Sequence, residues 1–280
     1  MVGLANPQFG SKREKTLQKS LDLLIALDIS TSMMATDIRP NRLTRATSFC
    51  EKLLARRRGD RIGLIIFAGH AWLQMPLTND FAAALLFLRT ASPDMAPTQG
   101  TAIAEAIEMA EKSLDRTDEN SSGGNALLIL TDGENHDDDA IDQAEQAAEN
   151  GLVLFPIAVG TPEGGQIPVD NGGGLPDWKR DENGEIVVSK LNEKLIADLA
   201  KAGNGRALLL SDGDAALNEL ENQLDRLEKR ERETRSFSEF ESWFQWAVAI
   251  ALLLFCLDFW LGWKRGAAFP IAEYGLRNAD

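Results

Sequence analysis

Short apolar runs that alternate with segments of helical periodicity are the feature that most constrains the fold of this chain. Residues 21–27 are one such run, which reads as a buried strand because it is short, mostly apolar and ended by polar residues. Strands that alternate with helices indicate an α/β fold, with a mostly parallel central sheet covered by helices on both faces. The predicted strands are 21–27, 61–69, 71–77, 125–133, 151–160 and 206–211, and the predicted helices are 42–57, 79–90, 101–114, 137–150 and 189–205.

Two segments depart from this regular pattern. The run 71–77 contains Pro76, which would interrupt an inner ladder, so we expect an edge strand there. The stretch near 161–190 is rich in Gly, Pro and Asp and contains "DENGE", which is typical of a hairpin turn. We interpret it as a surface insertion of loops and short strands. Its triple glycine is not followed by Gly-Lys-Ser/Thr, so no phosphate loop is indicated.

The chain becomes highly charged and helix-prone from residue 214 to residue 235. Four leucines recur there at spacings of 3, 4 and 3, namely Leu217, Leu220, Leu224 and Leu227. Two interpretations stay open: a last helix that packs on the sheet, or a stalk that leads towards a membrane. We assign 20–222 to the globular domain and 223–242 to a charged helical stalk or linker.

Residues 243–263 form a strongly apolar segment of about the 20 residues that cross a bilayer core. Tryptophans lie at both of its ends, and Lys264 and Arg265 follow directly. The segment predicts one C-terminal transmembrane helix, with 264–280 as its tail. Residues 1–19 lack the basic start and apolar core of a secretory signal.

Charge and composition exclude some functions. The formal net charge is −14, which makes nucleic acid an improbable partner because phosphate binding relies on basic patches. The chain has two cysteines, Cys50 and Cys256, and no cluster of Cys and His that indicates zinc.

Polar side chains follow two of the predicted strands and open one helix. Asp28, Ser30 and Ser32 come directly after the first strand, in the pattern D-x-S-x-S, and Asp132 follows the strand that begins at residue 125. Thr101 stands at the start of a helix. In a parallel sheet these five groups converge at the edge formed by the carboxyl ends of the strands. Carboxylate and hydroxyl oxygens suit Mg²⁺, with Mn²⁺ or Ca²⁺ as alternatives.

These three segments, "DISTS", "GTA" and "TDG", resemble the metal-ion-dependent adhesion site of von Willebrand factor A (VWA) domains. The resemblance spans roughly residues 20–222 and implies a Rossmann-like VWA domain. It also implies that Asp28, Ser30, Ser32, Thr101 and Asp132 are the metal ligands, and that a protein partner supplies an acidic residue to the ion.

A narrower resemblance is carried by "MMATDIRPNRLTRA", "FAGHAWLQMPLTND", "VGTPEGGQIPV" and "DENGEIVVSKLNEKLI". Together with the terminal apolar helix, these segments are similar to the membrane-anchored VWA proteins of the aerotolerance (Bat) type. That family implies a complex with sister VWA proteins and a MoxR-type AAA+ ATPase, in stress tolerance or envelope maturation. It also implies the bacterial inner membrane, with the VWA domain in the periplasm, and "GLANPQFG" in 1–19 resembles the exit of a preceding span.

The main alternative is a Mg²⁺-dependent phosphohydrolase of the haloacid dehalogenase type, with Asp28 as the covalent nucleophile. That class needs a second acidic residue two positions later, where this chain has Ser30. A serine hydrolase is disfavoured, because there is no G-x-S-x-G and only His70 and His136 could act as the base. We therefore expect a binding module and not an enzyme.

Overall fold

The computed structural model describes residues 21–115, 124–134, 139–169, 177–238, 248–257 and 260. Residue contacts divide the chain into two units, of which the larger is Thr16–Thr234. The smaller unit combines Met1–Lys15 with Arg235–Asp280. The predicted N-terminal segment, the tail and His136 lie outside the described residues.

A six-stranded sheet forms the centre of the larger unit, in the order β10-β5-β4-β1-β2-β3. β1 lies between β2 and β4 and is parallel to both. β3 pairs with β2 alone and is antiparallel to it, which confirms the predicted edge strand. The bounds are β1 (Asp22–Asp28), β2 (Arg61–Phe67), β3 (Ala71–Thr78), β4 (Asn125–Thr131), β5 (Leu152–Ala158) and β10 (Leu208–Leu209).

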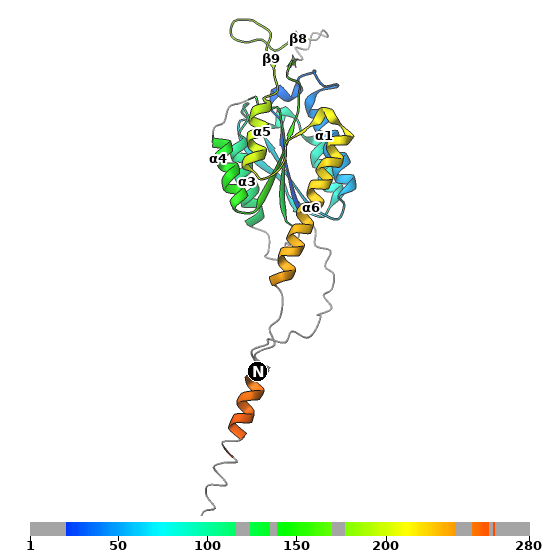
Figure 1. Ribbon diagram of the computed structural model, residues 1–280. Coiled ribbons are helices and arrows are strands. Elements are labelled where there is room, and N and C mark those ends of the chain that lie inside the picture. The colour runs from blue at the N-terminus through cyan, green and yellow to red at the C-terminus, as the bar shows by residue number, and fades with distance from the viewer. Residues whose placement is uncertain are drawn as a thin grey trace, which may run out of the picture. The chain divides into compact units, whose positions relative to one another are not determined.

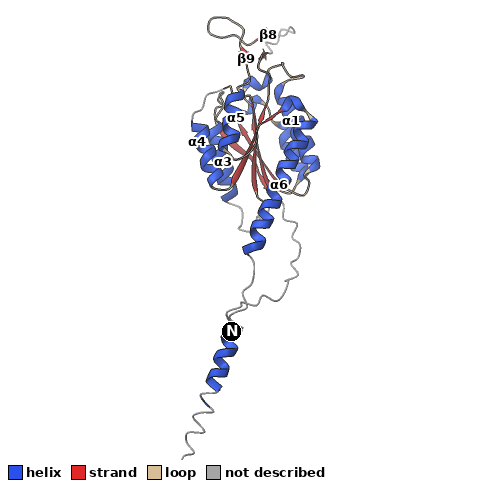
Figure 2. Cartoon of the chain, viewed as in Figure 1, coloured by secondary structure: helices blue, strands red, loops and turns tan. Residues whose placement is uncertain are grey.

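Helices cover both faces of this sheet, as predicted (Figure 2). Side chains of β1 alternate between two hydrophobic clusters: Leu23, Ile25 and Leu27 point to one, and Leu24 and Ala26 to the other. The first cluster includes α1 (Arg42–Arg56), α2 (Phe81–Thr90) and α6 (Asp214–Ser238). The second includes α3 (Ile103–Asp115), α4 (Asp139–Glu149) and α5 (Glu193–Ala202), which Figure 1 shows opposite α1 and α6.

The leucines of α6 pack on the sheet. Leu217, Leu220 and Leu224 are completely buried, and Leu227 packs against the same cluster. Of the two interpretations of this leucine spacing, packing on the core is therefore the one observed as far as Leu227. This contact continues past residue 222, where we placed the end of the domain. A stalk in 223–242 stays a prediction, since residues 239–242 are not described.

The insertion is built from two short antiparallel pairs. β6 (Gly165–Gln166) pairs with β9 (Val188–Ser189), and β7 (Pro168–Val169) pairs with β8 (Asp177–Trp178). Within "DENGE", the backbone N–H of Asp181 donates to the carbonyl of Glu185 at 2.9 Å, which confirms the predicted turn.

The described residues include no helix that has both the length and the apolar character to span a membrane. Of the predicted span 243–263, only residues 248–257 and 260 are described. They are helical, and their apolar side chains are exposed, among them Leu252, Leu254 and Phe255.

Candidate metal centre

The pairing of β1 brings Asp28 to the carboxyl edge of the sheet. Asp28 is in register with Phe67, the last residue of β2, and Leu27 is in register with Leu130 of β4. Thr131, the last residue of β4, and Asp132 after it therefore lie at the same edge. The parallel arrangement thus places two predicted ligands from distant parts of the sequence next to each other.

The Asp28 carboxylate is completely buried and accepts two hydrogen bonds. Its Oδ1 accepts from the backbone N–H of Ser30 at 2.8 Å, and its Oδ2 accepts from the Thr131 hydroxyl at 2.6 Å. Burial is the main cause that raises the pKa of Asp28 to about 7, and the nearby charge of Asp132 raises it further. A divalent cation beside this buried carboxylate would supply a compensating positive charge and would lower its pKa.

Ser30 and Ser32 lie beside Asp28: Ser30 is the N-cap of a 3₁₀ turn that spans Thr31–Met34, and Ser32 lies within that turn. Their hydroxyl oxygens are 2.9 Å apart, and both residues are nearly buried. Thr31 is held by its backbone N–H, which donates to Oε1 of Gln99 at 2.9 Å. The D-x-S-x-S segment therefore presents one carboxylate and two adjoining hydroxyls together.

Thr101 comes from a loop that packs against the end of β2. The N–H of Ala102 donates to the carbonyl of Ala68 at 2.7 Å, and the N–H of Gly69 donates to the carbonyl of Thr98 at 3.1 Å. A Cβ on Gly69 would lie 2.8 Å from the Gln99 carbonyl oxygen, so this close approach requires glycine. The Gln99 contact to Thr31 places the Thr101 loop beside the D-x-S-x-S turn.

Asp132 is also completely buried, and its carboxylate is shared among several donors. Oδ1 accepts from the N–H of Glu134 at 3.1 Å, and Oδ2 accepts from Nη1 of Arg42 at 2.7 Å. Its backbone carbonyl accepts from the N–H of Asn192, which caps α5, at 2.9 Å. These bonds fix Asp132 between β4, α1 and the start of α5.

Residues that the sequence analysis did not select also lie at this edge. Arg42 binds Asp132, Thr131 binds Asp28, and Lys179 of the insertion donates to the Thr31 hydroxyl at 2.9 Å. Burial raises the pKa of Glu134, as does the charge of Asp132. One signal for Arg42 was present in the sequence: a cation at the first position of a helix is unfavourable with the helix dipole and needs an acidic partner.

The residues present fit a small hard cation. No three side chains of His, Cys, Asp or Glu gather as metal ligands in the part of the chain that is described. The edge instead offers two carboxylates and the hydroxyls of Ser30, Ser32 and Thr101, which suit an oxygen-seeking ion such as Mg²⁺. Their role as ligands stays a prediction.

The geometry does not favour Asp28 as a phosphatase nucleophile. The side chain two positions later is Ser30, whose hydroxyl lies against that of Ser32. The Asp28 carboxylate is buried and has a hydrogen bond on each oxygen. No general acid is therefore available at the position where that mechanism requires one.

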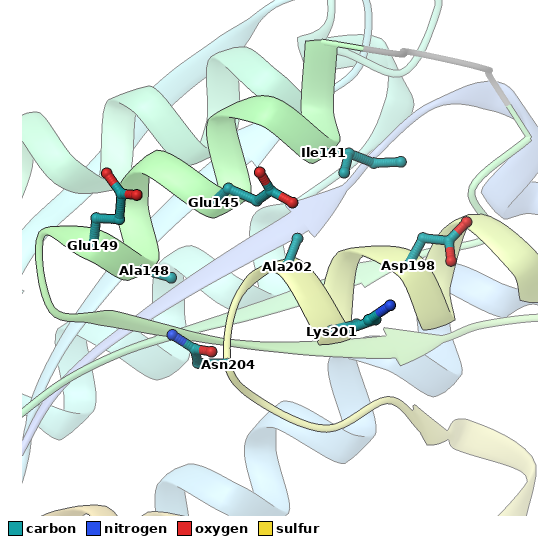
Figure 3. Close-up of a pocket in the computed structure, with 8 residues that line it drawn as sticks. All are labelled: Ile141, Glu145, Ala148, Glu149, Asp198, Lys201, Ala202 and Asn204. Atoms are coloured by element: carbon teal, nitrogen blue, oxygen red, sulfur yellow. The ribbon is translucent and has the colours of Figure 1, made fainter.

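A groove of about 450 Å³ lies elsewhere, between α4 and α5 (Figure 3). Its lining carries both signs of charge and includes Glu145, Glu149, Asp198 and Lys201. None of the five predicted ligands lines it. The polar edge of the sheet and this groove are thus separate features.

Sequence comparison identifies the fold family. Residues 23–134, which include all five predicted ligands, match the von Willebrand factor type A domain. The crystal structure of the conserved hypothetical protein BatB from Bacteroides thetaiotaomicron is 37% identical, with a TM-score of 0.70. The match covers 75% of this chain and 100% of that chain.

The chain belongs to the VWA family, in its aerotolerance (Bat) group. An aerotolerance-related membrane protein from Bacteroides fragilis NCTC 9343 is 35% identical, with a TM-score of 0.69 over 74% of this chain and 100% of that chain. The mussel byssus proximal thread matrix protein 1, solved with a zinc-occupied MIDAS motif, shares the fold at 16% identity and a TM-score of 0.52. That match covers 71% of this chain and 44% of that chain.

Among curated proteins, a UPF0353 protein of Mycolicibacterium paratuberculosis is 25% identical over 210 residues. The match covers 72% of this chain and 60% of that protein. The chain thus spans less than two thirds of the length of this relative. The family is a protein-interaction fold that carries a metal motif in some of its members.

Proposed function

We propose that this protein is a membrane-anchored VWA domain that binds a protein partner through a divalent cation, and that it is not an enzyme. The observation that carries the proposal is the gathering of Asp28, Ser30 and Ser32 beside Asp132 at one edge of the sheet. Those four residues and Thr101 hold the ion. When bound, the ion supplies a positive charge that an acidic side chain of the partner recognises.

Mg²⁺ is the cation that the donor set favours, because hydroxyl and carboxylate oxygens are hard ligands. Mn²⁺ and Ca²⁺ share this preference and are alternatives. The zinc held by the MIDAS motif of the mussel protein supports divalent occupancy of this type of site. The five protein groups leave room for a ligand from outside.

Membrane anchoring through residues 243–263 is part of the proposal. It is supported by the exposed apolar side chains of 248–257 and by the description of the Bacteroides fragilis relative as a membrane protein. We place the anchor in the bacterial inner membrane and the VWA domain in the periplasm. The resemblance to Bat proteins supports sister VWA proteins and a MoxR-type ATPase as members of the complex.

A crosslinked pull-down of the full chain from membranes tests the proposal. Wild type, Asp28→Ala and Asp142→Ala are compared in Mg²⁺ and in EDTA, with partners identified by mass spectrometry. Asp142 is an exposed carboxylate on α4 and serves as the matched control. Partners should be lost in Asp28→Ala and in EDTA, and kept in Asp142→Ala. Partners kept in every condition would refute metal-dependent binding.

A phosphatase assay on the same preparations tests the alternative. Mg²⁺-dependent hydrolysis of a phosphomonoester that is lost in Asp28→Ala would establish a phosphohydrolase instead. We expect equal background rates in wild type and variant.

A further inference from the structure

The side chain of Arg42 is completely buried next to the candidate metal centre. A guanidinium has five N–H donors, and each of the five has an acceptor here. Nε and Nη2 donate to the two oxygens of Asp37 at 2.9 and 2.8 Å. Nη1 donates to Asp132 at 2.7 Å and to the Ser189 hydroxyl at 2.6 Å, and Nη2 also donates to the Ser189 carbonyl at 2.9 Å.

The insertion and its borders hold this guanidinium in place. Ser189 belongs to β9, and Thr161 fixes Asp37 by donating its N–H to Oδ2 at 2.8 Å. A Cβ at Gly160 would lie 3.0 Å from Cζ of Arg42, so glycine at this position makes room for the guanidinium. Arg42 therefore has little freedom to turn away from Asp132.

Asp132 is consequently a predicted metal ligand that already has a positive partner. A cation fixed on one oxygen of a carboxylate reduces the attraction of that carboxylate for a second cation, and in a buried site this effect is weakly screened. The same charge also repels the ion directly. If Arg42 only anchored the insertion, its ion pair with Asp37 and its hydrogen bonds to Ser189 would be sufficient. The contact of Arg42 with Asp132 would then not be required.

We propose that Arg42 is a positioning residue whose charge on Asp132 lowers the affinity of the site for its divalent cation. The inference rests on the proposed metal site and goes beyond it, because it assigns a role to a residue that is not a ligand. Because the Arg42-paired Asp132 donates less charge to the ion, the ion stays more electrophilic towards a carboxylate of the partner.

The test is a titration of the full chain in detergent with Mn²⁺, followed by isothermal calorimetry, with circular dichroism to establish that each variant is folded. Arg42→Gln should bind Mn²⁺ about tenfold more tightly than wild type, a typical size for coupling between sites. Arg42→Lys keeps the charge and should restore affinity towards the wild-type value. A purely structural role predicts the opposite, since disturbing the site would weaken binding in both variants.

A double variant keeps the test decisive if Arg42→Gln does not fold. Asp37→Asn with Arg42→Gln removes one charge of each sign, so the net charge is unchanged and Asp37 is not left as an unpaired carboxylate, while Asp132 still loses its positive partner. It should also bind Mn²⁺ about tenfold more tightly. The matched control is Arg57→Gln with Asp60→Asn, an ion pair of 2.8 Å before the amino end of β2, which should leave the affinity unchanged.

Asp28→Ala shows whether a negative result refutes the metal site itself or only the role of Arg42. If it binds Mn²⁺ as wild type does, the metal site itself is wrong. If Asp28→Ala loses Mn²⁺ binding while the folded variants that contain Arg42→Gln bind Mn²⁺ no more tightly than wild type, the metal site stands and the role of Arg42 is refuted.

Discussion

Asp28 is a charged group buried without a full counter-charge, and this sets how the metal-free protein responds to pH. Its pKa rises from an ordinary value of 3.8 to about 7 in the folded state, first because of burial and then because of Asp132. Between these two values the folded protein binds more protons than the unfolded chain. Stability from this residue is therefore complete below pH 3.8 and is lost as the pH rises through 7.

The first prediction concerns Asp28→Asn in EDTA. The amide carries no charge, so the variant does not lose stability through ionisation at this position. Its stability relative to wild type should therefore increase as the pH rises from 4 to 8. Urea unfolding at several pH values measures the difference. Parallel pH profiles for the two proteins would show that ionisation of the Asp28 carboxylate does not reduce the stability of the folded protein.

The second prediction concerns Gly160, which has a φ of 139° and faces Arg42. Gly160→Ala should destabilise the fold by about 1–3 kcal/mol, because it adds backbone strain and displaces the guanidinium. Gly59→Ala is the control, since a Cβ there meets nothing within 4 Å. Denaturant midpoints measure both, and equal midpoints would mean that Arg42 is not closely confined.

The sequence predicts which polar residues follow the strands, but not what they touch. Asp28 and Asp132 could be placed at one edge because parallel strands end together. Arg42 could not be placed, because two of its three partners are 90 residues away at Asp132 and 147 residues away at Ser189. Such contacts depend on the path of the insertion, which Gly- and Pro-rich sequence does not specify.

At the level of elements, the alternation of apolar runs predicts most of the observed order. The mostly parallel sheet, the edge position of β3 and the helices on both faces are confirmed, whereas the antiparallel direction of β3 was not predicted. The strand expected at 206–211 is shorter than predicted, since β10 spans only Leu208–Leu209 and a 3₁₀ turn follows at Leu210–Asp212. Three successive leucines suggest a strand locally, but only two residues find a partner in β5.

The third prediction tests whether α6 is part of the core. Leu224→Ala should cost about 2–5 kcal/mol of the free energy of unfolding, because Leu224 is completely buried. Leu86→Ala on α2 is the control, and with 63% of the residue exposed it should change stability by less than about 0.5 kcal/mol. If Leu224→Ala does not change the free energy of unfolding, α6 beyond residue 222 would be interpreted as a stalk and not as part of the core.

At the level of the whole molecule, a chain of formal net charge −14 needs another means than charge to stay near an anionic bilayer. The proposed anchor at 243–263 provides it. The fourth prediction is that the full chain stays in the membrane fraction after a high-salt wash, while a chain ended at Ser238 is released. Immunoblots of the fractions measure this, and a full chain found in the wash would contradict the anchor.

The proposed function depends on the binding of a divalent cation at the carboxyl edge of β1. The most direct test is anomalous diffraction from crystals of residues 16–234 soaked in Mn²⁺. We expect one strong peak about 2.1 Å from the hydroxyl oxygens of Ser30 and Ser32, beside Asp28 and Thr101. No peak at that position, or a peak only in the groove between α4 and α5, would contradict metal binding at this edge.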